Sequence, residues 1–257
     1  MAEDYSSRHL TRSEDKSSAI QGLANEMKRH IKSPYTAGLW YINLSLDLLW
    51  QRVPWNTCVR ATSYRAPSWS WLSIDGPVML PNFDSGIPAP KVEILQSSTN
   101  MQGTNSGVDP QYNTLHIRGR LARGLIDRSD KIGSNLIHRV LGYKPIETYG
   151  PYEALGFEIT CDFPPLEEEG FVEIYIVQLV GYGRFFDTNT SCAQGLVLER
   201  VKGKLQFTRY GHFDFGAGKA QLRRLVMAFD KFDRSETSEI LLFERRGNSN
   251  IYNICLV

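Results

Sequence analysis

Cysteine and histidine are scarce in this sequence and are never clustered. The four cysteines, Cys58, Cys161, Cys192 and Cys255, lie far apart without a C-x-x-C motif, and the five histidines form no H-x-x-x-H or H-x-E pattern. Zinc sites need closely spaced ligands of these types, and disulfide-stapled domains carry dense sets of cysteines. We therefore expect reduced, packed thiols and no bound metal.

Long hydrophobic runs and blocks of one charge are missing as well. The apolar stretches, such as Ile174–Val180, are strand-sized, and the N-terminus lacks the basic and apolar regions of a signal peptide. The 29 basic residues are balanced by 28 acidic ones, which leaves no electrostatic footprint for nucleic acid or an anionic membrane. We expect a soluble, cytoplasmic protein with no membrane insertion and no nucleic-acid partner.

Motifs for cofactor binding and covalent catalysis are also missing. The chain has no G-x-G-x-x-G turn, no Walker loop and no G-x-S-x-G elbow. Ser13–Lys16 matches the S-x-x-K of acyl-serine enzymes, but the partner motifs S-D-N and K-T-G are absent and the match overlaps a helix start. We expect no cofactor.

Two helices are predicted near the N-terminus. Thr11 and Glu14 have the spacing of a capping box, in which each side chain bonds the other residue's backbone amide at a helix start. A second, short helix is predicted from Ser45 through Trp50. The apolar residues that recur at helical steps in the first helix are Ile20, Leu23, Ala24, Met27 and Ile31.

After Trp50 the apolar residues recur at every second position, as in strands. Residues 115–121 and 157–163 are examples, and Phe171–Tyr182 is apolar on both faces and should be a central strand. Residues 84–110 are rich in Ser, Asn, Gly and Pro, which predicts a long surface loop or lid.

The predicted fold class is therefore mainly β with N-terminal helices (α+β). Residues 1–55 would form a helical segment packed on an antiparallel β-domain of residues 56–257, and the two would unfold as one cooperative unit. The patterns leave a β-sandwich and a β-barrel open for the second part.

All five tryptophans lie between residues 40 and 71, and the densest stretch is YRAPSWSWLSIDG, residues 64–76. If all five are buried, at about 200 Å² each, they contribute on the order of 25 kcal/mol of apolar burial as an upper bound. The simplest interpretation is a hydrophobic joint between the helices and the β-domain. Trp69 and Trp71 have the same parity, so an extended strand would point both in one direction.

Three stretches of the sequence resemble a known family. YSSRHLTRSEDKSSAIQGLA, YTAGLWYINLSLDLLW and YRAPSWSWLSIDG are similar, in order and approximate spacing, to the three blocks that follow the conserved domain of fungal heterokaryon incompatibility (HET) proteins. A weaker likeness continues over nearly the whole chain. The upstream domain, which is associated with incompatibility and cell death, is not matched here. The resemblance thus implies the fold of the downstream region and no catalytic residues.

Two functions remain as expectations. The first is a cofactor-independent cyclase of fungal secondary metabolism, of the pericyclase or Diels-Alderase type and so of the isomerase or lyase class. It would bind a small hydrophobic substrate and act by preorganising it and donating one hydrogen bond to an activating carbonyl. The alternative is a non-enzymatic interaction or regulatory module derived from an incompatibility protein, with a protein partner.

The candidate site residues under the cyclase hypothesis come mainly from the tryptophan-rich segment. Asp75 is expected to orient Arg65 or to form the Asp-Gly turn rather than to act as a base. An enclosed apolar cavity of roughly a few hundred Å³ with one or two convergent donors would favour the enzyme, whereas a filled core with a large exposed apolar patch would favour the module. The expected substrate walls are Trp40, Trp50, Trp69 and Trp71, and the expected catalytic donors are Tyr64, Arg65 and His116.

Overall fold

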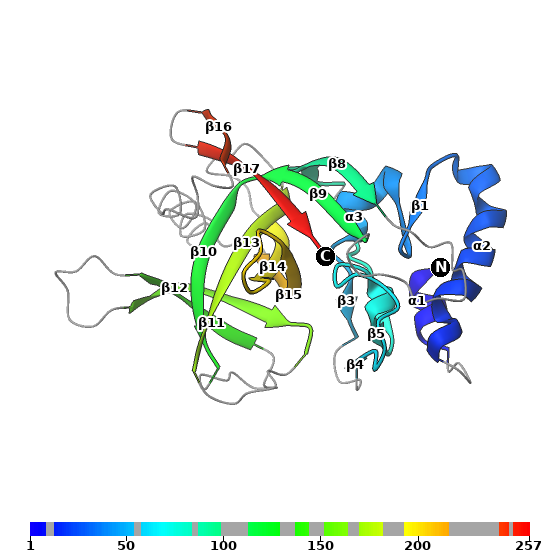
Figure 1. Ribbon diagram of the computed structural model, residues 1–257, viewed down its shortest axis with the longest axis horizontal. Coiled ribbons are helices and arrows are strands. Elements are labelled where there is room, and N and C mark those ends of the chain that lie inside the picture. Colours follow the sequence, from blue (N-terminus) through cyan, green and yellow to red (C-terminus); the bar gives the residue numbers. More distant parts are fainter. Residues whose placement is uncertain are drawn as a thin grey trace.

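A computed structural model describes residues 1–8, 13–53, 58–83, 87–98, 113–128, 137–143, 152–163, 170–181, 193–215, 242–246 and 249–257. It is mainly β with helices at the N-terminal end, which confirms the predicted fold class. Figure 1 shows two parts side by side: helices and short strand pairs, coloured blue to cyan, and a large curved sheet, coloured green to red. No helix within the described ranges is long and apolar enough to span a membrane.

The first predicted helix is present, but its apolar stripe is only partly buried. Ile20 and Ala24 face the core, whereas Leu23 and Met27 are exposed, because the helix lies against the rest of the protein along one narrow edge. The predicted capping residue Thr11 lies outside the described residues. The elements of this region are α1 (Ala2–Ser6), the 3₁₀ turn η1 (Ser13–Asp15) and α2 (Lys16–Ile31).

A short helix and three small strand pairs connect α2 to the sheet. The second predicted helix ends earlier than expected, since α3 stops at Asp47 and the chain then turns so that Trp50 enters the core. The pairs are β1 with β2, β3 with β6, and β4 with β5. The elements are β1 (Tyr35–Thr36), β2 (Leu39–Trp40), η2 (Tyr41–Asn43), α3 (Leu44–Asp47), β3 (Gln51–Arg52), β4 (Val59–Arg60), η3 (Trp71–Ser73), β5 (Ile74–Asp75) and β6 (Val78–Met79).

The remaining strands form one large sheet in the order β12-β11-β10-β13-β14-β15-β17-β9-β8, with β16 beside β17 and β7 beside β13. It was predicted to be antiparallel but is mixed, because β15 and β17 run parallel where Phe207 pairs with Leu256. The strands are β7 (Ala89–Pro90), β8 (Glu93–Ser98), β9 (Thr114–Gly119), β10 (Leu121–Asp127), β11 (Ile137–Tyr143), β12 (Tyr152–Cys161), β13 (Phe171–Gly181), β14 (Ala193–Arg200), β15 (Phe207–Phe215), β16 (Leu242–Arg246) and β17 (Ser249–Leu256).

Two strands, the short β7 and the longer β8, lie where a loop was predicted. β8 falls within residues 84–110 and pairs with β9 from Glu93 to Ser98. The Ser- and Asn-rich composition hid it, because an edge strand with one exposed face needs few apolar residues. The other residues of the predicted loop or lid lie largely outside the described ranges.

The sheet curls until β12 meets β15. Thr160 and Cys161 pair with His212 and Gly211, and the amide of Asp162 donates to the carbonyl of Tyr210 at 3.0 Å just beyond this pairing. Gly211 permits it, since a Cβ atom there would collide with the carbonyl oxygen of Thr160. A sandwich and a barrel were left open by the sequence, and the described strands do not form a complete closed barrel.

β13 separates two hydrophobic cores, as expected for a central strand with two apolar faces. Tyr175 and Val177 belong to the larger core, which is shared by the sheet and the N-terminal part. Ile174 and Ile176 belong to a smaller core inside the curl of the sheet. The alternation follows from the two-residue period of a strand. The tryptophan-rich segment therefore lies against one face of the central strand's sheet.

Candidate functional site

The tryptophan-rich segment fills the larger core. Trp50, Trp69 and Trp71 are completely buried there. Trp50 Nε1 donates to the carbonyl of Trp69 at 2.9 Å, and Trp71 Nε1 donates to the carbonyl of Gly38 at 2.9 Å. The segment is not an extended strand, as was assumed when Trp69 and Trp71 were expected to point in one direction, because Trp71 begins the 3₁₀ turn η3. The Ser70 side chain caps this turn by accepting a hydrogen bond from the amide of Leu72.

Two cavities lie beside this segment, and none of the tryptophans predicted as substrate walls lines either of them. Trp40 is half-buried and packs on Tyr35, with ring centroids 4.9 Å apart. The Tyr64 cavity measures about 310 Å³ and is lined by Arg60, Ala61, Ser63, Tyr64, Arg65, Ala66, Ser68, Ser73, Thr208 and Val257. The Lys16 cavity measures about 190 Å³ and is lined by Ser6, Ser7, Arg8, Ser13, Lys16, Asp75, Gly76 and Pro77.

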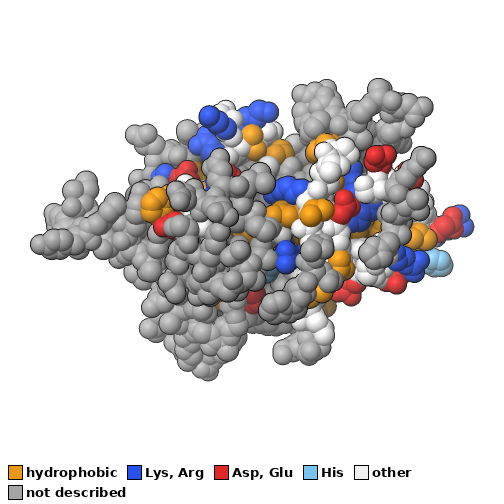
Figure 2. All heavy atoms as spheres, turned by 90° about the horizontal axis from the view of Figure 1, so that it is seen from below, with side chains coloured by type: hydrophobic (Ala, Val, Ile, Leu, Met, Phe, Trp, Pro, Cys, Tyr) orange, Lys and Arg blue, Asp and Glu red, His pale blue; other side chains and the backbone are white. Residues whose placement is uncertain are grey.

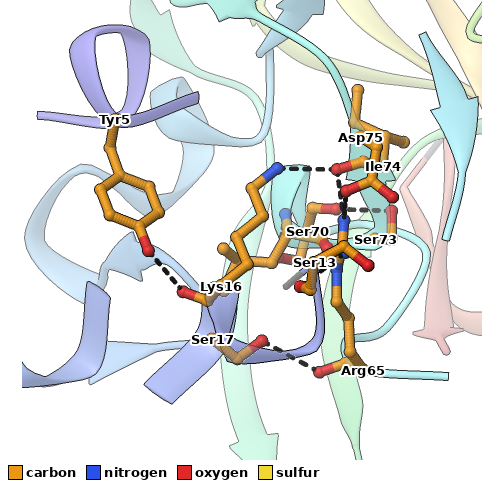
Figure 3. Close-up of polar contacts among 10 residues, drawn as sticks. Tyr5, Ser13, Lys16, Ser17, Arg65, Ser70, Ser73, Ile74 and Asp75 are labelled. Carbon is orange, nitrogen blue, oxygen red and sulfur yellow. Dashed lines mark hydrogen bonds and ion pairs between the residues drawn. The ribbon is translucent and has the colours of Figure 1, made fainter. Parts of the chain in front are cut away.

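Arg65 lies between these cavities and is buried (Figure 3). Its guanidinium donates to the carbonyls of Leu72, Ser13 and Ile74 at 2.5, 3.0 and 2.6 Å. Nη2 also contacts Oδ1 of Asp75 at 2.5 Å, as expected for a carboxylate that orients Arg65. Each guanidinium nitrogen therefore already has a partner, so this predicted donor ties the start of α2 to the tryptophan-rich segment.

Lys16, the first residue of α2, points its ammonium group at the carbonyl oxygen of Ile74, which also accepts from Arg65. Its side chain is buried, and Nζ donates to the carbonyl oxygen of Ile74 at 2.7 Å (Figure 3). Nζ also lies 5.0 Å from the ring centroid of Trp71. Burial, and then the neighbouring Arg65, lower the pKa of Lys16 to about 8. The sequence showed Lys16 only as the end of an S-x-x-K match.

The helix start is fixed by two further hydrogen bonds. The Tyr5 hydroxyl donates to the carbonyl of Lys16 at 3.2 Å, and the Ser17 hydroxyl donates to the carbonyl of Arg65 at 3.3 Å. Figure 3 shows these groups converging from α1, α2 and the segment that ends at Asp75. Three stretches that are distant in the sequence are thus held together by polar contacts around two buried cations.

The other two predicted donors lie in different surroundings. Tyr64 is on the wall of its cavity, 42% exposed, and its hydroxyl accepts a hydrogen bond from Nδ2 of Asn113 at 3.0 Å. His116 is half-buried on β9, where its Nε2 lies 3.8 Å from Sγ of Cys255. The structure therefore brings Tyr64 and Arg65 to one cavity, while His116 is not among the residues that line it.

A buried ion pair that was not predicted joins the sheet to the N-terminal part. Arg209 on β15 is completely buried and contacts the Asp162 carboxylate at 2.7 Å. It also donates to the carbonyls of Leu48 and Trp50 at 2.7 and 2.6 Å, and its guanidinium lies 3.7 Å from the Trp50 ring centroid. Arg209 appears in the sequence as an ordinary polar position of a strand, and its partners lie 47 to 161 residues away.

No known protein provides a guide to this site. The chain matches no protein-family model, no curated protein and no solved structure. The resemblance to the region downstream of the HET domain therefore stays a prediction. Among the described residues, no group of three or more His, Cys, Asp and Glu side chains is placed to hold a metal ion. The function has to be argued from the two cavities and the contacts around them.

Proposed function

We propose that this protein is a non-enzymatic, small-molecule-binding module with an interaction or regulatory role, and that a small, mainly apolar molecule binds in the Tyr64 cavity. The observation that carries the proposal is the cavity itself. Its volume of about 310 Å³ is at the lower end for ligand sites, and most of its wall is apolar.

Three hydroxyl groups of the wall, those of Ser68, Ser73 and Thr208, are committed to structural partners, which favours binding over catalysis. The Ser68 hydroxyl donates to the carbonyl of Val257 and accepts from the amide of Arg209. The Ser73 hydroxyl donates to Ser70 and the Thr208 hydroxyl to Glu199, both at carbonyl oxygens. Four of the five N–H donors of Arg65 are committed in the same way. A bound molecule would therefore be held chiefly by shape and apolar contact.

A regulatory role is supported by where the wall residues come from. Arg60 to Ser73 belong to the segment that carries the tryptophans, whereas Thr208 and Val257 belong to the large sheet. A molecule that touches both would stabilise their contact by mass action, by about 3 kcal/mol when it is present at a hundred times its dissociation constant. Figure 2 shows basic and acidic side chains interspersed over the described part of one face, so a charge-driven partner is not supported there.

The cofactor-independent cyclase is the second candidate, and one observation favours it. The Tyr64 hydroxyl stands on the wall of an apolar cavity, where a phenol can donate to a substrate carbonyl and stabilise developing negative charge. In this hypothesis Tyr64 is the predicted donor retained, because Arg65 commits four of its five N–H donors to structural acceptors and His116 does not line the cavity.

Binding and turnover of linear dienes and polyenes distinguish the two functions. We expect saturable binding to the wild type by calorimetry, and its loss in Ala61→Phe, which fills the cavity. Ala89→Phe is the matched control, since Ala89 is exposed on β7. Binding without product supports the module. Product formation that Tyr64→Phe slows while binding persists supports the cyclase. Equal binding by wild type and Ala61→Phe would remove the cavity from both proposals.

A further inference from the structure

The Lys16 cavity presents a different chemistry from the Tyr64 cavity, with which it shares no lining residue. It lies between the end of α1, the start of α2 and the turn that follows β5. Three serines and two cationic side chains contribute to its wall, and Asp75 is its one carboxylate. It is therefore a small polar cavity at the surface of the N-terminal part.

Two buried cations meet at this cavity on a single acceptor. Nζ of Lys16 and Nη2 of Arg65 both donate to the carbonyl oxygen of Ile74, at 2.7 and 2.6 Å. Two like charges on one oxygen repel each other, and burial deprives both of water. Asp75 pairs with Arg65 at 2.5 Å and so offsets one of these charges. One positive charge is left without a described ionic partner.

Lys16 is that cation. Its residue is 4% exposed, and within the described part of the chain the carbonyl of Ile74 is its one hydrogen-bond acceptor. An ammonium group carries three donors, so two remain for a ligand in the cavity that Lys16 lines. Arg8 adds a second cationic side chain to the wall; it is exposed and pairs with Asp4 at 2.8 Å.

We propose that the Lys16 cavity binds a small oxyanion of the phosphate class, either free phosphate or the phosphate group of a small monoester. Its volume of about 190 Å³ admits such a group. Lys16 supplies the buried counter-charge and two N–H donors, and Arg8 supplies a second cation at the wall. The anion relieves the repulsion between Lys16 and Arg65, which links binding to the position of α2.

The test is a titration with inorganic phosphate at constant ionic strength, followed by calorimetry and by the thermal midpoint, with sodium chloride as the reference. We expect saturable binding to the wild type. Lys16→Met should weaken it by about tenfold or more, because a charge-assisted hydrogen bond is lost. Lys28→Met is the matched control on the exposed side of α2, and its affinity should equal that of the wild type.

A second variant keeps the test decisive if Lys16→Met fails to fold. Arg8→Gln alters an exposed side chain, so folding is preserved, and phosphate affinity should fall several-fold. The titration is repeated with glycerol 3-phosphate, which is a phosphate monoester, and with acetate, which is a carboxylate. Tighter binding of the monoester identifies an organic phosphate as the ligand. A response no larger than that to chloride would overturn the proposal, and so would full affinity in Lys16→Met or, where that variant does not fold, full affinity in Arg8→Gln.

Discussion

At the scale of single residues, Lys16 makes the clearest prediction. Burial and Arg65 lower the pKa of its ammonium group from 10.5 to about 8. Between these values the unfolded chain binds the proton and the folded chain does not, so the Lys16 contribution to stability rises with pH. Below about pH 8 the buried charge of Lys16 destabilises the folded protein by its full amount, on the order of 3 kcal/mol.

Lys16→Met should therefore stabilise the protein in phosphate-free buffer at pH 7, and the gain should shrink as pH rises from 8 to 10.5. Urea unfolding of both proteins across this range measures the difference. Tyr5, whose pKa is raised by burial, also titrates in alkaline solution in both proteins, whereas the pKa of Cys58 should rise further in Lys16→Met because the charge of Lys16 lowers it in the wild type. A gain that is constant with pH would show that Lys16 keeps its ordinary pKa in the folded chain.

The same scale shows what the sequence can predict of this site and what it cannot. The burial of Trp50, Trp69 and Trp71 followed from the size and number of the tryptophans alone, whereas Trp40 is only half-buried. The role of Arg65 did not follow, because the neighbouring residues in the sequence do not show whether its guanidinium faces a ligand or three carbonyl oxygens. Lys16 and Arg209 were missed for a related reason, since their main acceptors lie 58 and 161 residues away in the sequence.

At the scale of elements, two glycines of the N-terminal part make opposite predictions. Gly22 lies in the middle of α2, is exposed, and has open space where a Cβ atom would be. Gly22→Ala should therefore stabilise the protein by about 0.5–1 kcal/mol, because alanine loses less backbone entropy in a helix. The measurement is the urea midpoint, with an unchanged slope.

Gly38→Ala is the paired experiment, and it should destabilise the protein by about 1–3 kcal/mol. Gly38 has φ of +88°, and an added Cβ atom would lie 2.8 Å from Nε1 of Trp71, whose hydrogen bond goes to the Gly38 carbonyl. Equal effects of the two substitutions would contradict the packing of the β1–β2 turn on Trp71. The sequence predicts neither effect. The helical period of α2 does not show that the face with Gly22 is exposed, and no pattern places Gly38 against Trp71.

At the scale of the whole molecule, the period of the apolar residues was enough for the fold class and not for the closure of the sheet. Alternation predicts strands and their buried faces, and it correctly marked β13 as central. It says nothing about which edges meet. The curl depends on Gly211 beneath the Thr160 carbonyl, and the alternation gives no sign that β15 and β17 pair in parallel.

Arg209 joins the two parts of the molecule, because it pairs with Asp162 within the sheet part and donates to the carbonyls of Leu48 and Trp50 in the N-terminal part, and this joint makes the last prediction. Burial opposes ionisation of Asp162, but Arg209 and His212 outweigh it and lower its pKa to about 2. Asp162→Asn leaves the Arg209 charge buried without its partner, so we expect a loss of about 3–5 kcal/mol. The loss should shrink as pH falls from 3.8 towards 2, because over this range Asp162 takes up a proton in the unfolded wild type while it stays ionised in the folded wild type, which lowers the stability of the wild type.

The carbonyls of Leu48 and Trp50 make this experiment informative about cooperativity. Since Arg209 bonds both, loosening it should weaken the N-terminal part together with the sheet. Tryptophan fluorescence, which reports the N-terminal part, and far-ultraviolet circular dichroism, which reports mainly the sheet, should therefore shift to lower urea by equal amounts in Asp162→Asn. Glu199→Gln, on β14, is the control for loss of a carboxylate and should shift neither probe. If only the fluorescence transition moved, the two parts would unfold separately, and the prediction of one cooperative unit would be wrong.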